Sequence, residues 1–252
     1  MSFLLLHGLG GDRRQSIDLV GPCLPADARV LAPDLRAHGD SRLIGDAADF
    51  SFAAITAELA DTVREHGFDQ DPLTVIGISL GAAISLRLVQ SGQLPIARLV
   101  LLRPAFTDQP IPPNLALFPV IGELLHRHPA DRAEAIFRRT GLYRGLRLAS
   151  RLGASGVIEQ FRTPDASARA VRLVELPRNR AFEADDRVID LPTTIIAAPR
   201  DPLHPLSVAS AWHRRLPASA LVEVPARDDG MAPYLAATRA AVRSALQSPS
   251  PG

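Results

Sequence analysis

The sequence GISLG at positions 77–81 places Ser79 between two glycines, after the apolar run LTVI and before an alanine-rich helical pattern. A G-x-S-x-G sequence in this context forms a sharp turn from a strand into a helix, in which the glycines avoid steric clashes and the serine Oγ is exposed. The N-terminus of the helix adds backbone N–H donors beside that oxygen. We therefore predict that Ser79 is a nucleophile; the alternative is a serine in an ordinary glycine-rich turn.

A second glycine-rich stretch, HGLGG at 7–11, follows the first apolar run of the chain. Its glycines allow a backbone N–H, that of Leu9, to meet the N–H of Leu80 at the oxygen of a reacting carbonyl group. We predict that these two amides form an oxyanion hole, and that Gly8 and Gly10 border the substrate.

The elements that position these residues can be read from the hydrophobic pattern. Six short apolar runs predict strands buried on both faces of a parallel sheet and ending in loops. They are FLLLHG (3–8), RVLAPD (29–34), LTVIGIS (73–79), ARLVLLRP (97–104), TTIIAAPRD (193–201) and ALVEVPAR (220–227). Helical patterns lie between them, one from Ser51 as N-cap to Gly67 as stop, and others at 80–89, 205–216 and 233–246. This alternation predicts right-handed βαβ units and an α/β, doubly wound fold class.

The alternation stops between 104 and 189, where proline, arginine and helical fragments occur without a convincing strand. We predict a helical cap inserted after the fourth strand, with residues 1–103 and 190–247 forming one core. The proline-rich start of the insertion is interpreted either as a hinge or as an ordinary surface connection. The SPSPG sequence at 248–252 is predicted to be a disordered tail.

Arginines recur just after the predicted strand ends, where substrate pockets of open α/β sheets lie. A guanidinium cluster there would bind a carboxylate or phosphate, and we predict that Arg103 contacts the substrate. Ion pairing with aspartates at the same strand ends is the favoured interpretation for the group as a whole. The arginines are Arg13, Arg14, Arg36, Arg103, Arg200 and Arg227, and the aspartates are Asp34, Asp40, Asp201, Asp228 and Asp229.

Together, HGLGG, GISLG and APDLRAHGDS at 32–41 resemble motifs of the α/β-hydrolase superfamily. The resemblance covers most of the chain and implies a mainly parallel sheet of about six strands with a cap after the fourth. It also implies that His7 shapes the oxyanion loop and that His38 packs beneath that loop. The sequence departs from the family in two respects, because the usual first hairpin is expected to be missing and the usual terminal histidine is absent.

The family order of serine, acid and histidine places the acid at Asp201 and leaves no histidine after the sixth strand. VPARDDGMAPY at 224–234 offers Asp228 or Asp229 there, and a carboxylate is a poor base for a serine. His204, three residues after Asp201, is the nearest histidine. We predict that His204 is the base and that Asp201 with Asp229 orients it, since triads are defined by geometry rather than chain order. The alternative is that His204 only caps the following helix or pairs with a carboxylate.

Composition limits the class of partner. The 252 residues contain 28 basic residues, all arginine, and 27 acidic ones, so a net charge of +1 gives no electrostatic case for nucleic acid or a membrane surface. Cys23 is the only cysteine and is predicted to be a buried filler. His126 and His128 lack a third ligand, so we predict no metal site. No signal peptide or run of about 18 apolar residues is present, which predicts a cytoplasmic protein.

These observations predict a serine-dependent acyl hydrolase that acts on a small-molecule ester, thioester or amide without a cofactor. One alternative is a biosynthetic enzyme of the same fold that performs acyl transfer, cyclisation or elimination. Another is a non-catalytic protein that binds a small molecule, because fold does not fix function. The sequence makes no prediction about the oligomeric state.

Overall fold

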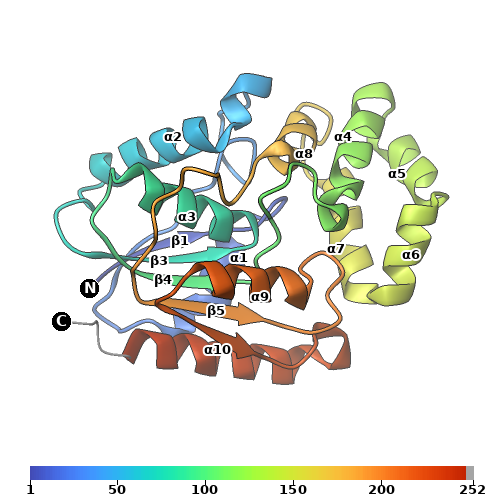
Figure 1. Cartoon of the computed structure of the whole chain (residues 1–252). Coiled ribbons are helices and arrows are strands. Elements are labelled where there is room, and N and C mark those ends of the chain that lie inside the picture. Colours follow the sequence, from blue (N-terminus) through green and yellow to red (C-terminus); the bar gives the residue numbers. More distant parts are fainter. Residues whose placement is uncertain (248–252) are drawn as a thin grey trace.

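A single sheet of six parallel strands forms the centre of the molecule, in the order β2-β1-β3-β4-β5-β6 (Figure 1). The computed structural model describes residues 1–247, so the predicted tail at 248–252 lies outside the described residues. The α/β class and the six strands are confirmed. The strands are β1 (Ser2–Leu6), β2 (Arg29–Leu31), β3 (Leu73–Ile78), β4 (Ile96–Leu102), β5 (Thr193–Ala197) and β6 (Ser219–Glu223).

Side chains alternate between the two faces of the sheet, and each face is covered by its own helices. In β1, Leu4 and Leu6 belong to the core beneath α2, α3 and α9, whereas Phe3 and Leu5 belong to the core beneath α1 and α10. Burial on both faces explains why the strands read as continuous apolar runs. The helices are α1 (Arg13–Val20), α2 (Phe52–Glu65), α3 (Leu80–Ser91), α9 (Leu206–Arg215) and α10 (Met231–Gln247).

Local signals account for the ends of these helices. Ser51 caps α2, because its Oγ accepts a hydrogen bond of 3.2 Å from the N–H of Ala54, and Gly67 follows the helix with a φ of +67°. The last helix, α10, begins at Met231 rather than at Pro233. A proline in the first turn is tolerated there, since the first N–H groups of a helix have no intrahelical acceptor.

The strands are shorter than the apolar runs identified in the sequence, because the residues at the end of each run belong to the following loop. The strand β1 ends at Leu6, β4 at Leu102 and β5 at Ala197. The residues that follow form loops at the carboxyl edge of the sheet. Because all six strands are parallel, the loops that carry the candidate site residues meet at this one edge.

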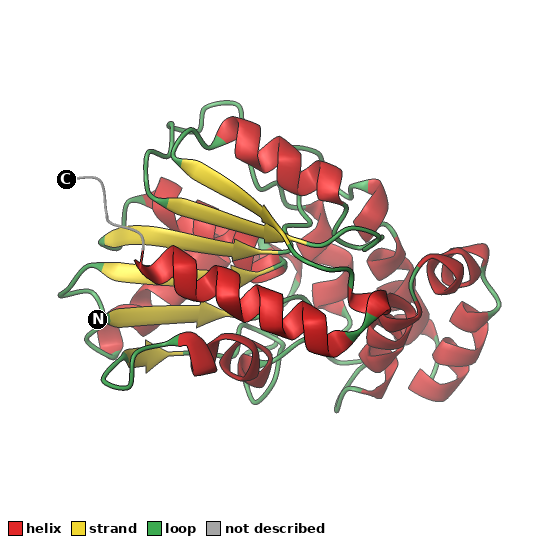
Figure 2. Cartoon of the chain, turned by 90° about the horizontal axis from the view of Figure 1, so that it is seen from below, coloured by secondary structure: helices red, strands yellow, loops and turns green. Residues whose placement is uncertain are grey.

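Helices without a strand fill the described chain between β4 and β5, and they lie beyond the carboxyl ends of the strands (Figures 1 and 2). We call residues 104–189 the helical segment. Its division from the core into a cap domain stays a prediction. The helices are α4 (Leu117–Arg127), α5 (Ala130–Arg138), α6 (Gly141–Ala149), α7 (Arg151–Arg162) and α8 (Val171–Glu175). Within residues 1–247, no helix has the length and apolar character needed to cross a membrane.

Candidate active site

Ser79 occupies the turn from β3 into α3 with φ of 55° and ψ of −104°. Residues other than glycine rarely adopt this backbone conformation. The flanking glycines make this turn possible. A Cβ at Gly77 would lie 2.4 Å from the backbone of Gly81, and a Cβ at Gly81 would lie 2.4 Å from the carbonyl oxygen of Leu6. The close backbone approach excludes larger residues and holds Ser79 above the strand ends.

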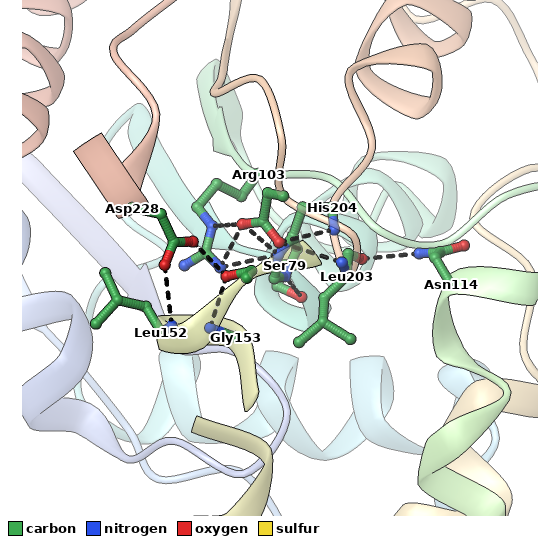
Figure 3. Close-up of polar contacts among 10 residues, drawn as sticks. Ser79, Arg103, Asn114, Leu152, Gly153, Leu203, His204 and Asp228 are labelled. Atoms are coloured by element: carbon green, nitrogen blue, oxygen red, sulfur yellow. Dashed lines mark hydrogen bonds and ion pairs between the residues drawn. The ribbon is translucent and has the colours of Figure 1, made fainter. Parts of the chain in front are cut away.

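His204 lies directly against the serine, with its Nε2 atom 2.9 Å from the Oγ of Ser79 (Figure 3). Its loop is held from two sides. The N–H groups of Leu203 and His204 each donate to Oδ1 of Asp201 over 3.2 Å. From the helical segment, Asn114 donates to the carbonyl oxygen of Leu203 over 2.8 Å. The distance between His204 and Ser79 is within the range that proton transfer requires.

The other ring nitrogen of His204 has two partners that compete for it. Nδ1 lies 3.0 Å from Oδ2 of Asp201 and 2.8 Å from Nη2 of Arg103, and Arg103 also donates to Asp201 over 2.8 Å. A guanidinium only donates, so Nδ1 either donates to Asp201 or accepts from Arg103. When Nδ1 donates, Nε2 has a free lone pair toward Ser79 and can act as a base. When Nδ1 accepts, Nε2 carries the proton and cannot.

Burial and charge set the protonation of this group of residues. Burial, followed by the charge of Arg103, lowers the pKa of His204 to about 4, although Asp201 opposes this shift. Burial by itself would raise the pKa of Asp201, but His204 and Arg103 hold it well below its usual range. His204 is therefore neutral near pH 7, the state that a general base needs, and Asp201 is a carboxylate.

Replacing Arg103 with glutamine should move the acid limb of the pH profile to higher pH. For the native protein, kcat/KM for a neutral ester is expected to rise with an apparent pKa near 4, as His204 loses its proton. Removing the Arg103 cation removes one cause of the lowered pKa. Profiles of kcat/KM from about pH 3 to about pH 8 for both proteins test this. An unmoved limb, or one at lower pH, would contradict the coupling of Arg103 to His204.

Two buried histidines support the loop after β1. Nδ1 of His7 donates to the carbonyl oxygen of Gly8 over 2.9 Å, and its Nε2 accepts from the N–H of Leu35 over 3.0 Å. The ring of His38 packs 4.9 Å from that of His7. Burial lowers the pKa of both histidines, so both rings are neutral near pH 7. His7 joins the loop after β1 to Leu35, and Nδ1 of His38 donates to the carbonyl oxygen of Arg36 over 2.7 Å.

The loop after β1 and the start of α3 border the serine. Gly8, Leu9 and Gly10 line the same cavity as Ser79. Gly10 has a φ of +77°, and a Cβ there would overlap the side chain of Gln160. Leu80 is the first residue of α3, where N–H groups have no intrahelical acceptor and can bind an anion.

The cavity at Ser79 has a volume of about 150 Å³ and is walled by core loops and by the helical segment. The helical segment contributes mainly apolar and small residues, which suits an acyl or alkyl group. They are Phe106, Leu115, Phe118, Leu152, Gly153, Gly156, Val157 and Gln160. The core contributes polar groups that include Gln15, Ser79, Arg103, His204 and Arg227.

The sequence analysis predicted that Asp229 helps to orient His204, but the structure does not bring these two side chains together. Asp229 forms an ion pair with Arg200, and its side chain is 59% exposed. Asp228 is turned toward the helical segment, where it accepts from the hydroxyl of Ser150 and from the N–H of Leu152 over 3.2 Å. The loop after β6 therefore directs both carboxylates away from His204, and Asp201 is the carboxylate that contacts it.

Most arginines at the strand ends are paired, as the sequence analysis favoured. Arg13 pairs with Asp34, Arg36 with Glu58, Arg103 with Asp201 and Arg200 with Asp229. Arg103 lines the cavity as predicted for a substrate contact, but its guanidinium is held by Asp201 and His204. Among residues 1–247, no group of three or more metal-ligating side chains could hold a metal ion.

Sequence reasoning missed Asn114, Gln15 and Gln160. Asn114 fixes the His204 loop, Gln15 accepts from the N–H of Gly8 over 2.7 Å, and Gln160 borders the cavity. These residues stand in no motif, so only their position in space identifies them. Arg227 was recognised as one of several arginines, and nothing in its local sequence separates it from the others.

Comparisons with known proteins place the chain in a family. Residues 2–228 match the sequence profile of the family described as alpha/beta hydrolase fold. The chain is 30% identical over 245 residues to a pimeloyl-[acyl-carrier protein] methyl ester esterase of Aromatoleum aromaticum, covering 92% of this chain and 91% of the relative. A protein of the same name from Neisseria meningitidis serogroup B is 28% identical over 226 residues, covering 86% and 81%.

Solved structures agree on the fold. The structure of MenH from S. aureus superimposes with a TM-score of 0.74 at 16% identity, covering 98% of this chain and 93% of that one. That of Rv0554 from Mycobacterium tuberculosis has a TM-score of 0.66 at 20% identity, covering 97% and 88%. The profile match, the relatives and the parallel sheet together show that the chain belongs to the alpha/beta hydrolase fold family and is an esterase-like hydrolase.

Proposed function

We propose that the chain hydrolyses a carboxylic ester with Ser79 as nucleophile, His204 as general base and Asp201 as the residue that orients His204. The contact of 2.9 Å between Nε2 of His204 and Oγ of Ser79, within a largely buried site, supports this proposal most directly. The acid and the histidine lie on one loop, after β5, instead of on two loops. Triads are defined by geometry, so this arrangement is compatible with the chemistry.

The reaction follows from these positions. The Oγ of Ser79 attacks the ester carbonyl carbon while Nε2 of His204 takes the hydroxyl proton. The N–H groups of Leu9 and Leu80 stabilise the oxyanion, and Gly8 and Gly10 let the substrate approach the backbone. His204 then gives its proton to the leaving alkoxide oxygen, which departs as an alcohol.

Deacylation repeats the same steps with water. His204 takes a proton from water, the resulting hydroxide attacks the acyl-serine, and the acid leaves as Ser79 recovers its proton from His204. Asp201 stabilises the imidazolium that forms in both halves of the reaction. These steps use side chains, backbone N–H groups and water.

We further propose that the helical segment acts as a cap over this site. Its apolar residues wall the cavity, and Asn114 and Ser150 connect it to the loops after β5 and β6. The relatives are named for pimeloyl-[acyl-carrier protein] methyl ester, so methyl esters of acyl chains, free or on acyl carrier protein, are the first substrates to assay.

Covalent labelling combined with product analysis tests the proposal. Exposure to a fluorophosphonate should add one adduct to the intact mass, and peptide mapping should place it on Ser79. The native protein should also release methanol from a methyl ester. An unlabelled protein that releases no methanol would contradict the proposal and favour a binding role. Labelling of Ser79 without hydrolysis, but with transfer of the acyl group to another acceptor, would contradict hydrolysis and favour acyl transfer.

A further inference from the structure

Arg227 lines the candidate active site and forms no ion pair with any residue of the described chain. It belongs to the short turn after β6 and lines the cavity that contains Ser79 and His204. It also lines an adjoining hollow of about 270 Å³ on the side of α1 and α10. Arg227 therefore lines both the cavity that contains Ser79 and a second space beside it.

The carboxylates around Arg227 are engaged with other groups. Asp201 is held by Arg103 and His204, Asp228 by Ser150 and Leu152, and Asp229 by Arg200. The Nε atom of Arg227 is buried and has no hydrogen-bond partner among residues 1–247. The ring of Tyr234 lies 5.9 Å from the guanidinium carbon, a cation–π contact that leaves the positive charge in place.

A half-buried cation that forms no ion pair is unfavourable, and binding of an anion relieves that cost. Burial and then the charge of Arg103 lower the pKa of Arg227, and the opposing effects of Tyr234, Asp201 and Asp228 do not cancel this shift. A guanidinium is also well suited to an oxyanion, because its N–H groups match the two oxygens of a carboxylate. Arg227 thus has the properties of a receptor for a negatively charged group.

We propose that Arg227 binds a carboxylate of the substrate, so that the preferred ester carries a negative charge close to its scissile carbonyl group. This inference rests on the proposed ester hydrolysis at Ser79 and specifies its substrate class. The cavity volume of about 150 Å³ corresponds to the space that a benzene-sized group occupies. Only a few carbon atoms fit between the ester and the charge, so half-esters of short dicarboxylic acids are the class that fits.

The experiment compares initial rates, expressed per ester group, for esters whose far end is either charged or neutral. Monomethyl and dimethyl esters of succinic, glutaric and adipic acid present the same scissile methyl ester with a charged or a neutral far end. They are assayed by methanol release with the native protein, Arg227→Gln and Arg227→Lys. Arg200→Gln is the matched control, since Arg200 also follows a strand end but is paired with Asp229.

The native protein is expected to hydrolyse at least one monomethyl ester with a kcat/KM about tenfold or more above that of its dimethyl ester. Arg227→Gln should lose that preference, falling about 10- to 100-fold on the monomethyl ester and less than about threefold on the dimethyl ester. Arg227→Lys should keep part of it, because the charge remains but the paired N–H geometry does not. Arg200→Gln should behave as the native protein.

Other results would overturn the inference. Equal losses on both esters would make Arg227 a structural residue, and a native protein without preference for the charged ester would exclude the subsite even if Arg227→Gln failed to fold. The labelling rate of Ser79 by a neutral fluorophosphonate reports whether each variant retains its site. If the native protein hydrolyses neither ester and Ser79 stays unlabelled, the proposed function itself fails. If the neutral ester is hydrolysed without a charge preference, only this inference fails.

Discussion

Replacing His204 with alanine is expected to lower kcat/KM for ester hydrolysis by about 10⁴- to 10⁶-fold. Nε2 of His204 lies 2.9 Å from the Oγ of Ser79, and its neutral state near pH 7 makes it the group able to take the proton. Without it, the serine hydroxyl must lose its proton to water. Methanol release from a methyl ester measures the loss, and the labelling of Ser79 by a fluorophosphonate should slow in parallel.

Two comparisons make this prediction specific. Asp229→Ala should keep activity within about threefold of the native value, because that carboxylate is exposed and paired with Arg200. Added imidazole should restore part of the rate to His204→Gly, since the missing group is a base that can be supplied from solution. A His204→Ala variant that retains a tenth or more of the native activity would require a base from elsewhere in the site.

Replacing Ser79 with alanine should abolish the fluorophosphonate adduct and lower kcat by about 10⁶-fold. The double variant Ser79→Ala with His204→Ala should be no slower than Ser79→Ala alone, because the two residues act as one unit and their losses do not add. The cavity and the amides of Leu9 and Leu80, the proposed oxyanion hole, remain in all three proteins and should account for the residual rate.

Ser91→Ala is the matched serine control for this prediction. Ser91 is the last residue of the same helix, α3, and its hydroxyl donates to the carbonyl oxygen of Leu88. This variant should still gain one adduct and release methanol at the native rate. An adduct that persists in Ser79→Ala would place the nucleophile elsewhere.

The parts of the site that the sequence predicted are those determined by local spacing. Gly77 and Gly81 identify the Ser79 turn because the backbones around them approach too closely for a side chain. His204 and Asp201 are three residues apart, so a short loop brings them together wherever it lies. The sheet was predictable for a similar reason, since burial on both faces leaves continuous apolar runs.

The partners of charged side chains could not be predicted in this way. Asp201 and Asp229 both follow strands that end at the same edge, and either could have oriented His204. The structure decides between them, because Asp229 forms an ion pair with Arg200 whereas Asp201 contacts His204 and Arg103. Such pairings join residues far apart in the sequence and depend on where each loop directs its side chains.

By itself, the sequence determined the α/β fold, the sharp turn at Ser79 and the closeness of a histidine to an aspartate. Their signals are periodicity, glycine spacing and short separation along the chain. Only the tertiary structure decided that the Nδ1 atom of His204 lies between Asp201 and Arg103, and that Arg227 lines the cavity without an ion pair to any described residue. These features arise from the packing of separate loops at one sheet edge, because an arginine has the same local sequence signal whether it is paired or free.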